Sequence, residues 1–182
     1  MAYNLAGMHD VDRYIFSRQN RHCVFISHKK EDEAAALVVG QYLTDIVGVN
    51  IYLDTEDCVL REAVSVENDR KIVDSIQTGL SCSSHLLCIL SDKTRLSWWV
   101  PYEIGFAEKQ GMDIAALKLA NVDDVPSYIK IKQTLYTVDD FLRYASKFGV
   151  YGSLFSDKRY VQLCEMDHGE LITYVDGGQA NE

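Results

Sequence analysis

Residues 22–27 have the sequence His-Cys-Val-Phe-Ile-Ser, a short apolar run rich in strand-forming residues that ends at a polar turn, residues 28–32. A second run, Ser84–Ser91, is longer and more hydrophobic. Both runs are nearly continuous in apolar character, which is typical of strands buried on both faces. Such strands belong to parallel sheets that helices cover on both sides. The two runs therefore predict the central strands of a parallel sheet.

Helical patterns separate the apolar runs. Apolar residues recur at helical spacing from Glu33 to Val47, and Gly48 follows as a natural helix stop. The same kind of spacing predicts further helices over residues 68–80, 97–111 and 139–148, and further strands over residues 49–53, 113–119 and 134–138. Strands that alternate with helices in this way form a parallel sheet with right-handed crossovers. The pattern predicts an α/β domain with a central five-stranded parallel sheet.

Length and composition predict one domain with tails. A chain of 182 residues with 47% hydrophobic content is long enough for one substantial core. We expect an N-terminal extension over residues 1–20, a domain over 21–148 and a C-terminal extension over 149–182, whose structure the pattern leaves open. The net charge of -9 argues against a nucleic-acid surface. Because no window approaches the roughly 20 apolar residues of a membrane span, we expect no membrane segment.

The cysteines and histidines predict neither disulfides nor a metal site. Five cysteines are an odd number, and they lack the regular spacing of a disulfide framework. Reduced thiols are typical of cytosolic proteins, so we expect a cytoplasmic location. Cys82 and Cys88 are six residues apart, and the five histidines are scattered along the chain, not paired at helical spacing.

The loops that follow the first three strands are the candidate ligand-binding segments. In open α/β sheets ligands bind outside the carboxyl ends of the strands, and residues 27–30, 54–57 and 91–103 share that edge. Pro101 is tolerated only in the first turn of a helix, so the helix begins near Trp98 or Trp99 and Glu103 lies within about one turn of its start. The helix end favours a charged carboxylate there by about 0.3 to 1 kcal/mol, which suits stabilisation of positive charge. A purely structural role for Glu103, as a cap of its own helix, is equally open from the local pattern.

The motif Ser97-x-Trp99-x-x-x-Glu103 resembles a segment of TIR (Toll/interleukin-1 receptor) domains, Ser-x-Trp-Cys-x-x-Glu, in which the glutamate is catalytic in the NAD-cleaving members. The strand ending in Ser27 is similar to that family's opening strand, and residues 52–54 resemble the end of its second strand. The resemblance covers roughly residues 20–145, with Val100 where the family often has cysteine. It implies a flavodoxin-like three-layer fold.

The loop over residues 55–68 lacks the Pro-Gly pair common in receptor adaptors, which favours the bacterial enzyme branch of the family. Within that branch the chain resembles the TIR subunit of Thoeris antiphage defence systems, which makes a cyclic ADP-ribose signal from NAD. This resemblance implies an NAD nucleosidase or ADP-ribosyl cyclase that uses NAD as its substrate without a separate cofactor. It also implies self-association through the 55–68 loop and a downstream effector protein that senses the nucleotide product.

The resemblance implies roles for individual residues. Glu103 would hold the ribose hydroxyls and stabilise the oxocarbenium-like ribose. Because nicotinamide leaves without a proton, one carboxylate suffices, whereas ordinary glycosidases need two. The remaining candidates for substrate binding are Phe25 and Trp99 as aromatic walls, Ser27, His28, Lys29 and Lys30 for the pyrophosphate, Asp54 for a ribose, and Ser97 of the motif. Core packing for the aromatic residues and a solvated surface position for the lysines remain open.

Other functions are compatible with the same pattern. One is a non-catalytic TIR module that recruits partners, in which Glu103 is only a cap. Another is an enzyme resembling nucleoside deoxyribosyltransferases, which have a related parallel fold and a covalent glutamyl-sugar intermediate. A simple flavodoxin-like nucleotide binder is disfavoured, because no glycine-rich phosphate loop follows the first strand.

Overall fold

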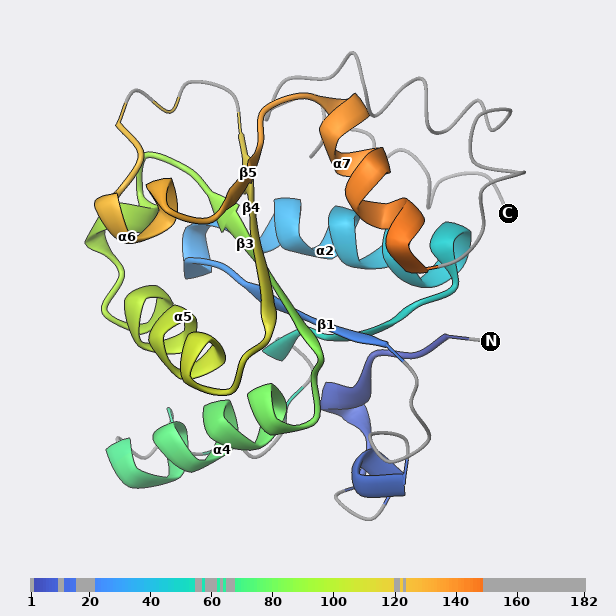
Figure 1. The fold of residues 1–182 in the computed structure, drawn as a ribbon. Coiled ribbons are helices and arrows are strands. Elements are labelled where there is room, and N and C mark those ends of the chain that lie inside the picture. The colour runs from blue at the N-terminus through green and yellow to red at the C-terminus, as the bar shows by residue number, and fades with distance from the viewer. Residues whose placement is uncertain are drawn as a thin grey trace.

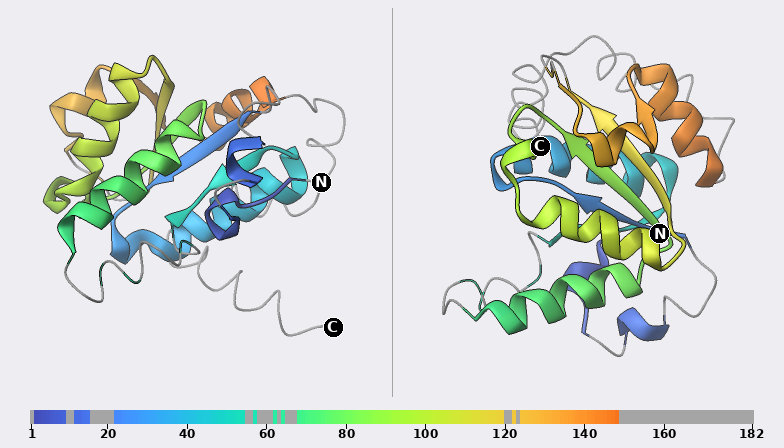
Figure 2. Two further views of the ribbon diagram at one scale, coloured as in Figure 1. Left: turned by 90° about the horizontal axis from the view of Figure 1, so that it is seen from below. Right: turned by 60° about the vertical axis from the view of Figure 1, so that its left-hand side comes forward.

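The computed structural model describes residues 2–9, 12–15, 22–54, 57, 62, 64, 68–119, 122 and 124–148. Within these residues a five-stranded sheet has the order β2-β1-β3-β4-β5, and every neighbouring pair is parallel (Figures 1 and 2). The strands are β1 (Cys23–Ser27), β2 (Asn50–Tyr52), β3 (His85–Leu90), β4 (Asp113–Lys118) and β5 (Gln133–Leu135). The predicted α/β fold with a central parallel sheet is confirmed.

Helices cover both faces of the sheet. On one face α2 (Glu33–Gln41) and α7 (Val138–Ala145) pack against alternate strand residues such as Val24 and Ile26. On the other face α4 (Asp69–Ser81), α5 (Trp99–Lys109) and the short α6 (Ser127–Lys130) pack against Cys23 and Phe25. Side chains of a strand point to alternate faces, so Ser27 lies on the α5 side of β1. Ser27 and α5 therefore lie on the same face of the sheet.

The helix ends follow the local signals of the sequence. α2 continues into a π-helical segment, η3 (Tyr42–Val47), which ends at Gly48 in the left-handed conformation with φ of 76°. The side chain of Asn68 caps α4 by accepting from the Lys71 amide, and Thr137 forms a capping box at the start of α7. The remaining turns are short 3-10 helices, namely η1 (Leu5–Gly7), η2 (Lys30–Asp32), η5 (Thr94–Leu96) and η6 (Ser146–Phe148).

Tyr3 and Asn4 of the N-terminal segment lie along the outer edge of β2. Asn4 forms a parallel bridge with Ile51, whose amide donates to the Tyr3 carbonyl at 3.0 Å. The Asn4 side chain also accepts from the Leu53 amide at 3.1 Å and donates to the Leu53 carbonyl at 3.2 Å. The segment that the sequence predicts as an extension is therefore hydrogen-bonded to the sheet.

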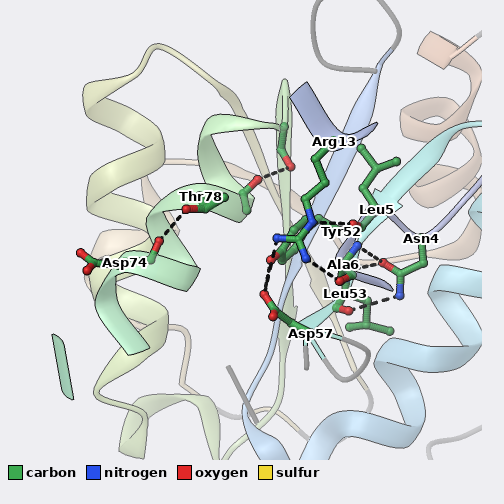
Figure 3. A network of polar contacts seen from close by, with 11 residues as sticks. Asn4, Leu5, Ala6, Arg13, Tyr52, Leu53, Asp57, Asp74 and Thr78 are labelled. Atoms are coloured by element: carbon green, nitrogen blue, oxygen red, sulfur yellow. Dashed lines mark hydrogen bonds and ion pairs between the residues drawn. The ribbon is translucent and has the colours of Figure 1, made fainter. Parts of the chain in front are cut away.

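Arg13 connects this segment to the loop that follows β2 (Figure 3). Its guanidinium donates to the carbonyls of Leu5 at 3.0 Å and Ala6 at 2.8 Å. It also lies 4.0 Å from Asp57 and 5.6 Å from the centroid of the Tyr52 ring, and the Tyr52 hydroxyl donates to Asp57. Arg13 is 4% exposed and Asp57 is fully buried, so this network is part of the protein interior.

No helix in the described part of the chain is both long and apolar enough to cross a membrane. Residues 149–182, the predicted C-terminal extension, lie outside the described residues, as do Cys58 and Cys164. Of the cysteines that the structure describes, Cys23 and Cys88 are buried free thiols.

Candidate functional site

The carboxyl ends of the parallel strands bring the predicted loops to one edge of the sheet. The strand order reverses between β1 and β3, because β1 is followed by β2 on one side and β3 lies on the other. Ser27 ends β1, Asp54 follows β2 and Ser91 follows β3. Open α/β sheets bind ligands at this kind of switch point.

Helix α5 begins at Trp99, as Pro101 predicted, and it carries Glu103 on its buried face. The buried residues of α5 are Val100, Glu103, Ile104 and Ala107, which form the stripe that a helix presents to a sheet. Glu103 is thus a carboxyl group within an otherwise apolar stripe, and it is only 6% exposed.

Glu103 bonds to the sheet, and Ser97 bonds to the helix start. The Ser27 hydroxyl donates to Glu103 Oε2 at 2.5 Å, which joins the end of β1 to α5. The Ser97 hydroxyl accepts from the Val100 amide at 3.2 Å, which satisfies one of the free amides of the first turn. The capping role at this helix start thus belongs to Ser97, while the Glu103 carboxyl bonds to the end of β1.

Burial, not the helix end, dominates the ionisation of Glu103. Desolvation raises the pKa of Glu103 to about 8, while the Ser27 hydrogen bond lowers this pKa and the charge of Asp54 raises it. The expectation that the helix start keeps Glu103 charged at neutral pH is therefore wrong. A helix end contributes up to about 2 kcal/mol, or about 1.5 pKa units, so it does not offset full burial.

Asp54 and His28 lie beside this carboxyl group. His28 Nε2 is 3.9 Å from Asp54 Oδ1, and His28 Nδ1 is 3.3 Å from the Ile26 carbonyl. Burial raises the pKa of Asp54, the imidazole of His28 lowers it, and the charge of Glu33 raises it. Two carboxyl groups, an imidazole and a hydroxyl thus converge at the sheet edge. Such a set can accept hydrogen bonds from sugar hydroxyls and, once ionised, can stabilise a positive charge.

The predicted aromatic residues occupy different environments. Phe25 is 2% exposed and stacks on the Tyr52 ring at 5.5 Å between centroids, so the structure favours its core role. Trp99 is 38% exposed and lies edge-on to Tyr102. The neighbouring Trp98 is 91% exposed. The two tryptophans therefore present aromatic surface to solvent.

The remaining predicted contacts lie at the rim or outside the described residues. Lys29 forms an ion pair with Glu31 at 2.9 Å, and Lys30 is exposed. The 55–68 loop is described at residues 57, 62, 64 and 68 only, so the predicted self-association through it stays a prediction. Among the described residues no group of three or more His, Cys, Asp or Glu side chains is arranged to hold a metal ion.

The family profile described as a TIR domain matches residues 24–148, which include β1 from Val24 onward, the other four strands and Glu103. The chain belongs to the TIR domain family. A search of curated proteins finds no match to this chain. The N-terminal segment along β2 lies outside the matched part of this TIR domain.

Sequence reasoning missed two buried residues at the site of this TIR domain. Cys88 on β3 is paired in register with Ser27, and its pKa is raised, first by burial and then by the charge of Glu103. Asp32 is fully buried and accepts from the Ser91 hydroxyl at 2.5 Å. Strand register brings Cys88 to Ser27, and register between strands distant in sequence cannot be read from periodicity alone.

Proposed function

We propose that this TIR domain cleaves NAD at the bond between nicotinamide and ribose. The observation that carries the proposal is the buried Glu103 carboxyl, which accepts a hydrogen bond from Ser27 at the carboxyl edge of the sheet. Ligands bind at this edge in open α/β sheets, and Glu103 is the residue that matches the catalytic glutamate of the NAD-cleaving members. Asp54 and His28 supply further polar groups within the same edge.

The reaction needs one ionised carboxylate. The C–N bond breaks, its electron pair leaves with nicotinamide as a neutral molecule, and the ribose carbon becomes cationic. Ionised Glu103 holds the ribose hydroxyls and stabilises this cation, so no general acid is required at the leaving group. Water then adds to the ribose carbon and loses a proton to give ADP-ribose, or an atom of the adenine attacks to give a cyclic product.

We further propose that the product is a signal. In the Thoeris type of antiphage defence, which the sequence resembles, a downstream effector protein senses a cyclic ADP-ribose made by the TIR subunit. The same role for this chain predicts a cyclic product, and it requires a pocket that excludes water from the cation. Mass spectrometry of the reaction products separates the cyclic product from linear ADP-ribose.

Nicotinamide release from NAD by the purified protein tests the proposal. We expect Glu103→Gln to lower the rate by at least about 100-fold, because it removes the charge that stabilises the cation. Glu108→Gln is the matched control, since Glu108 lies on the same helix with a 57% exposed side chain that pairs with Lys132. Failure of the wild-type protein to release nicotinamide, alone and under crowding, would contradict the proposal. Equal rates for wild type and Glu103→Gln would contradict it as well.

A partner-binding role is the second candidate, and a specific surface favours it. Leu96 and Trp98 are 65% and 91% exposed, and the partly exposed Trp99 adjoins them in sequence. Neighbouring exposed apolar residues of this size mark interaction sites. Sedimentation velocity of wild type and Trp98→Ser tests this role. Association that Trp98→Ser abolishes, in a protein that never releases nicotinamide, identifies a binding module.

A further inference from the structure

We infer that Ser27 is a positioning residue for Glu103 and does not bind the substrate pyrophosphate. Its hydroxyl is committed to the Glu103 carboxyl, which it orients within the sheet edge. The expected effect on the rate of NAD cleavage rests on the proposed function. The hydrogen bond between Ser27 and Glu103 does not depend on it.

The position of Ser27 leaves its hydroxyl no access to a phosphate in the solvent-facing part of the site. Ser27 is 1% exposed, and its oxygen lies 2.5 Å from Glu103 Oε2. A serine hydroxyl has one hydrogen to donate, and its partners here, the Glu103 carboxyl and the neighbouring Cys88 thiol, are both buried. Pyrophosphate binding through this hydroxyl would require it to leave Glu103.

The backbone around Ser27 makes the hydroxyl a rigid donor. Ser27 is the last residue of β1, and it pairs in register with Cys88 of β3. On the other side of β1, Phe25 pairs with Tyr52 of β2. A donor on a strand held between two neighbours positions its partner more tightly than a donor on a loop.

The bond also acts on the ionisation of Glu103, in the direction opposite to burial. An ionised carboxylate only accepts hydrogen bonds, so a fixed donor stabilises the ionised form. Burial raises the pKa of Glu103 to about 8, and the Ser27 hydrogen bond is the influence that lowers it. Loss of the hydroxyl should raise this pKa further.

Among the titratable groups near Glu103, Asp54 opposes its ionisation. Asp54, which follows β2, raises the pKa of Glu103 through its charge, and the thiol of Cys88 on β3 interacts electrostatically with Glu103. Other charged groups act on these neighbours in turn. His28 lowers and Glu33 raises the pKa of Asp54, and Asp32 raises the pKa of Cys88. Among the described residues, Ser27 is the side chain that donates a hydrogen bond to Glu103.

Ser91 provides a matched control. It directly follows β3 as Ser27 ends β1, it is 9% exposed, and its hydroxyl donates to a buried carboxyl, that of Asp32, at 2.5 Å. Ser91→Ala removes the same kind of bond from a carboxyl other than Glu103. A general effect of losing a buried serine hydroxyl should therefore appear in both variants.

The pH dependence of kcat/KM for NAD cleavage is the first test. We expect Ser27→Ala to move the midpoint of the acidic limb upward by about one pH unit, because a hydrogen bond to a charged group has that effect on ionisation. Ser27→Thr, which keeps the hydroxyl, should restore the midpoint, and Ser91→Ala should leave it unchanged. A raised KM for Ser27→Ala with an unmoved midpoint would establish the pyrophosphate role and overturn the inference.

A second test needs no activity. In the full chain with ¹³C-labelled glutamate, NMR follows the carboxyl titration of Glu103, and Glu103→Gln identifies its signal. We expect a midpoint near 8 for wild type, a higher one for Ser27→Ala and an intermediate one for Ser27→Cys, whose thiol is a weaker donor. Equal midpoints would overturn the inference. A shifted midpoint in a protein that cleaves no NAD would leave the inference standing and contradict the proposed function.

Discussion

Ionisation of Glu103 costs folding free energy, because the side chain lies in the apolar stripe of α5. The pKa of Glu103 is raised from its ordinary value of 4.5 to about 8 in the folded protein. Below pH 4.5 Glu103 is protonated in both the folded and the unfolded chain, so its burial costs no free energy of ionisation and the stability of the folded protein is fully retained. As the pH rises towards 8, Glu103 loses its proton in the unfolded chain first, and the free energy of unfolding therefore falls.

Glu103→Gln should remove this pH dependence. We expect the variant to match wild type at pH 4 and to be more stable at pH 8.5 by a few kcal/mol, since each pKa unit corresponds to about 1.4 kcal/mol. Urea denaturation of both proteins at the two pH values measures the difference. A free-energy difference that stays constant with pH would show that Glu103 titrates normally.

The same residue shows what sequence reasoning can and cannot give at this scale. Pro101 was enough to place the helix start, and the family motif was enough to single out Glu103. The spacing of Val100, Glu103, Ile104 and Ala107 also contained the signal for burial, because it is the stripe of a helix that faces a sheet. The hydrogen bond between Ser27 and Glu103 could not be predicted from the sequence, because it depends on how α5 packs over β1.

At the scale of elements, Gly79 allows α4 to pack closely on the sheet. A Cβ atom at this position would lie 2.6 Å from Cζ of Tyr52. The Tyr52 ring cannot easily move away, because it stacks on Phe25 and its hydroxyl bonds to Asp57. We expect Gly79→Ala to destabilise the protein by about 1 to 3 kcal/mol through overpacking, as measured by chemical denaturation.

Gly105→Ala is the control for this prediction. Gly105 lies inside α5, and a Cβ atom there would meet nothing within 4 Å. Alanine is a better helix former than glycine, so the variant should gain about 0.5 to 1 kcal/mol. If Gly79→Ala also gained stability, helix propensity and not the contact with Tyr52 would govern Gly79.

The elements that the sequence predicted well are those with long patterns. Continuous apolar runs predicted β1 and β3, because these strands are buried on both faces. Apolar residues at helical spacing predicted α2 and α4, because each helix is buried along one face. Two short elements were predicted less well. β5 was expected over residues 134–138 but spans Gln133–Leu135, and α6, with only the four residues Ser127–Lys130, was not predicted. One turn of helix is too short for periodicity to show.

Arg13 holds the N-terminal segment against the TIR domain. It is buried with Asp57, and it donates to two carbonyls of η1. Removal of one partner of a buried ion pair leaves a buried charge poorly compensated. We therefore expect Arg13→Ala to lower the free energy of unfolding by about 3 kcal/mol, as measured in urea.

Arg70→Ala is the comparison variant, since Arg70 forms an exposed ion pair with Asp74 at 3.8 Å on α4. Exposed pairs contribute little, so the change should stay below about 0.5 kcal/mol. An equally small loss in Arg13→Ala would mean that the N-terminal segment docks without help from this network.

The hydrogen bonds between Asn4 and β2 also determine where the folding unit begins. The family match starts at Val24, yet the amides of Ile51 and Leu53 on the outer edge of β2 are satisfied by residues 3 and 4. A fragment cut at the family boundary would leave both amides without these partners. Unpaired strand edges recruit strands of other chains, so such a fragment would be prone to edge-to-edge aggregation. An expression boundary for this TIR domain therefore belongs before Tyr3.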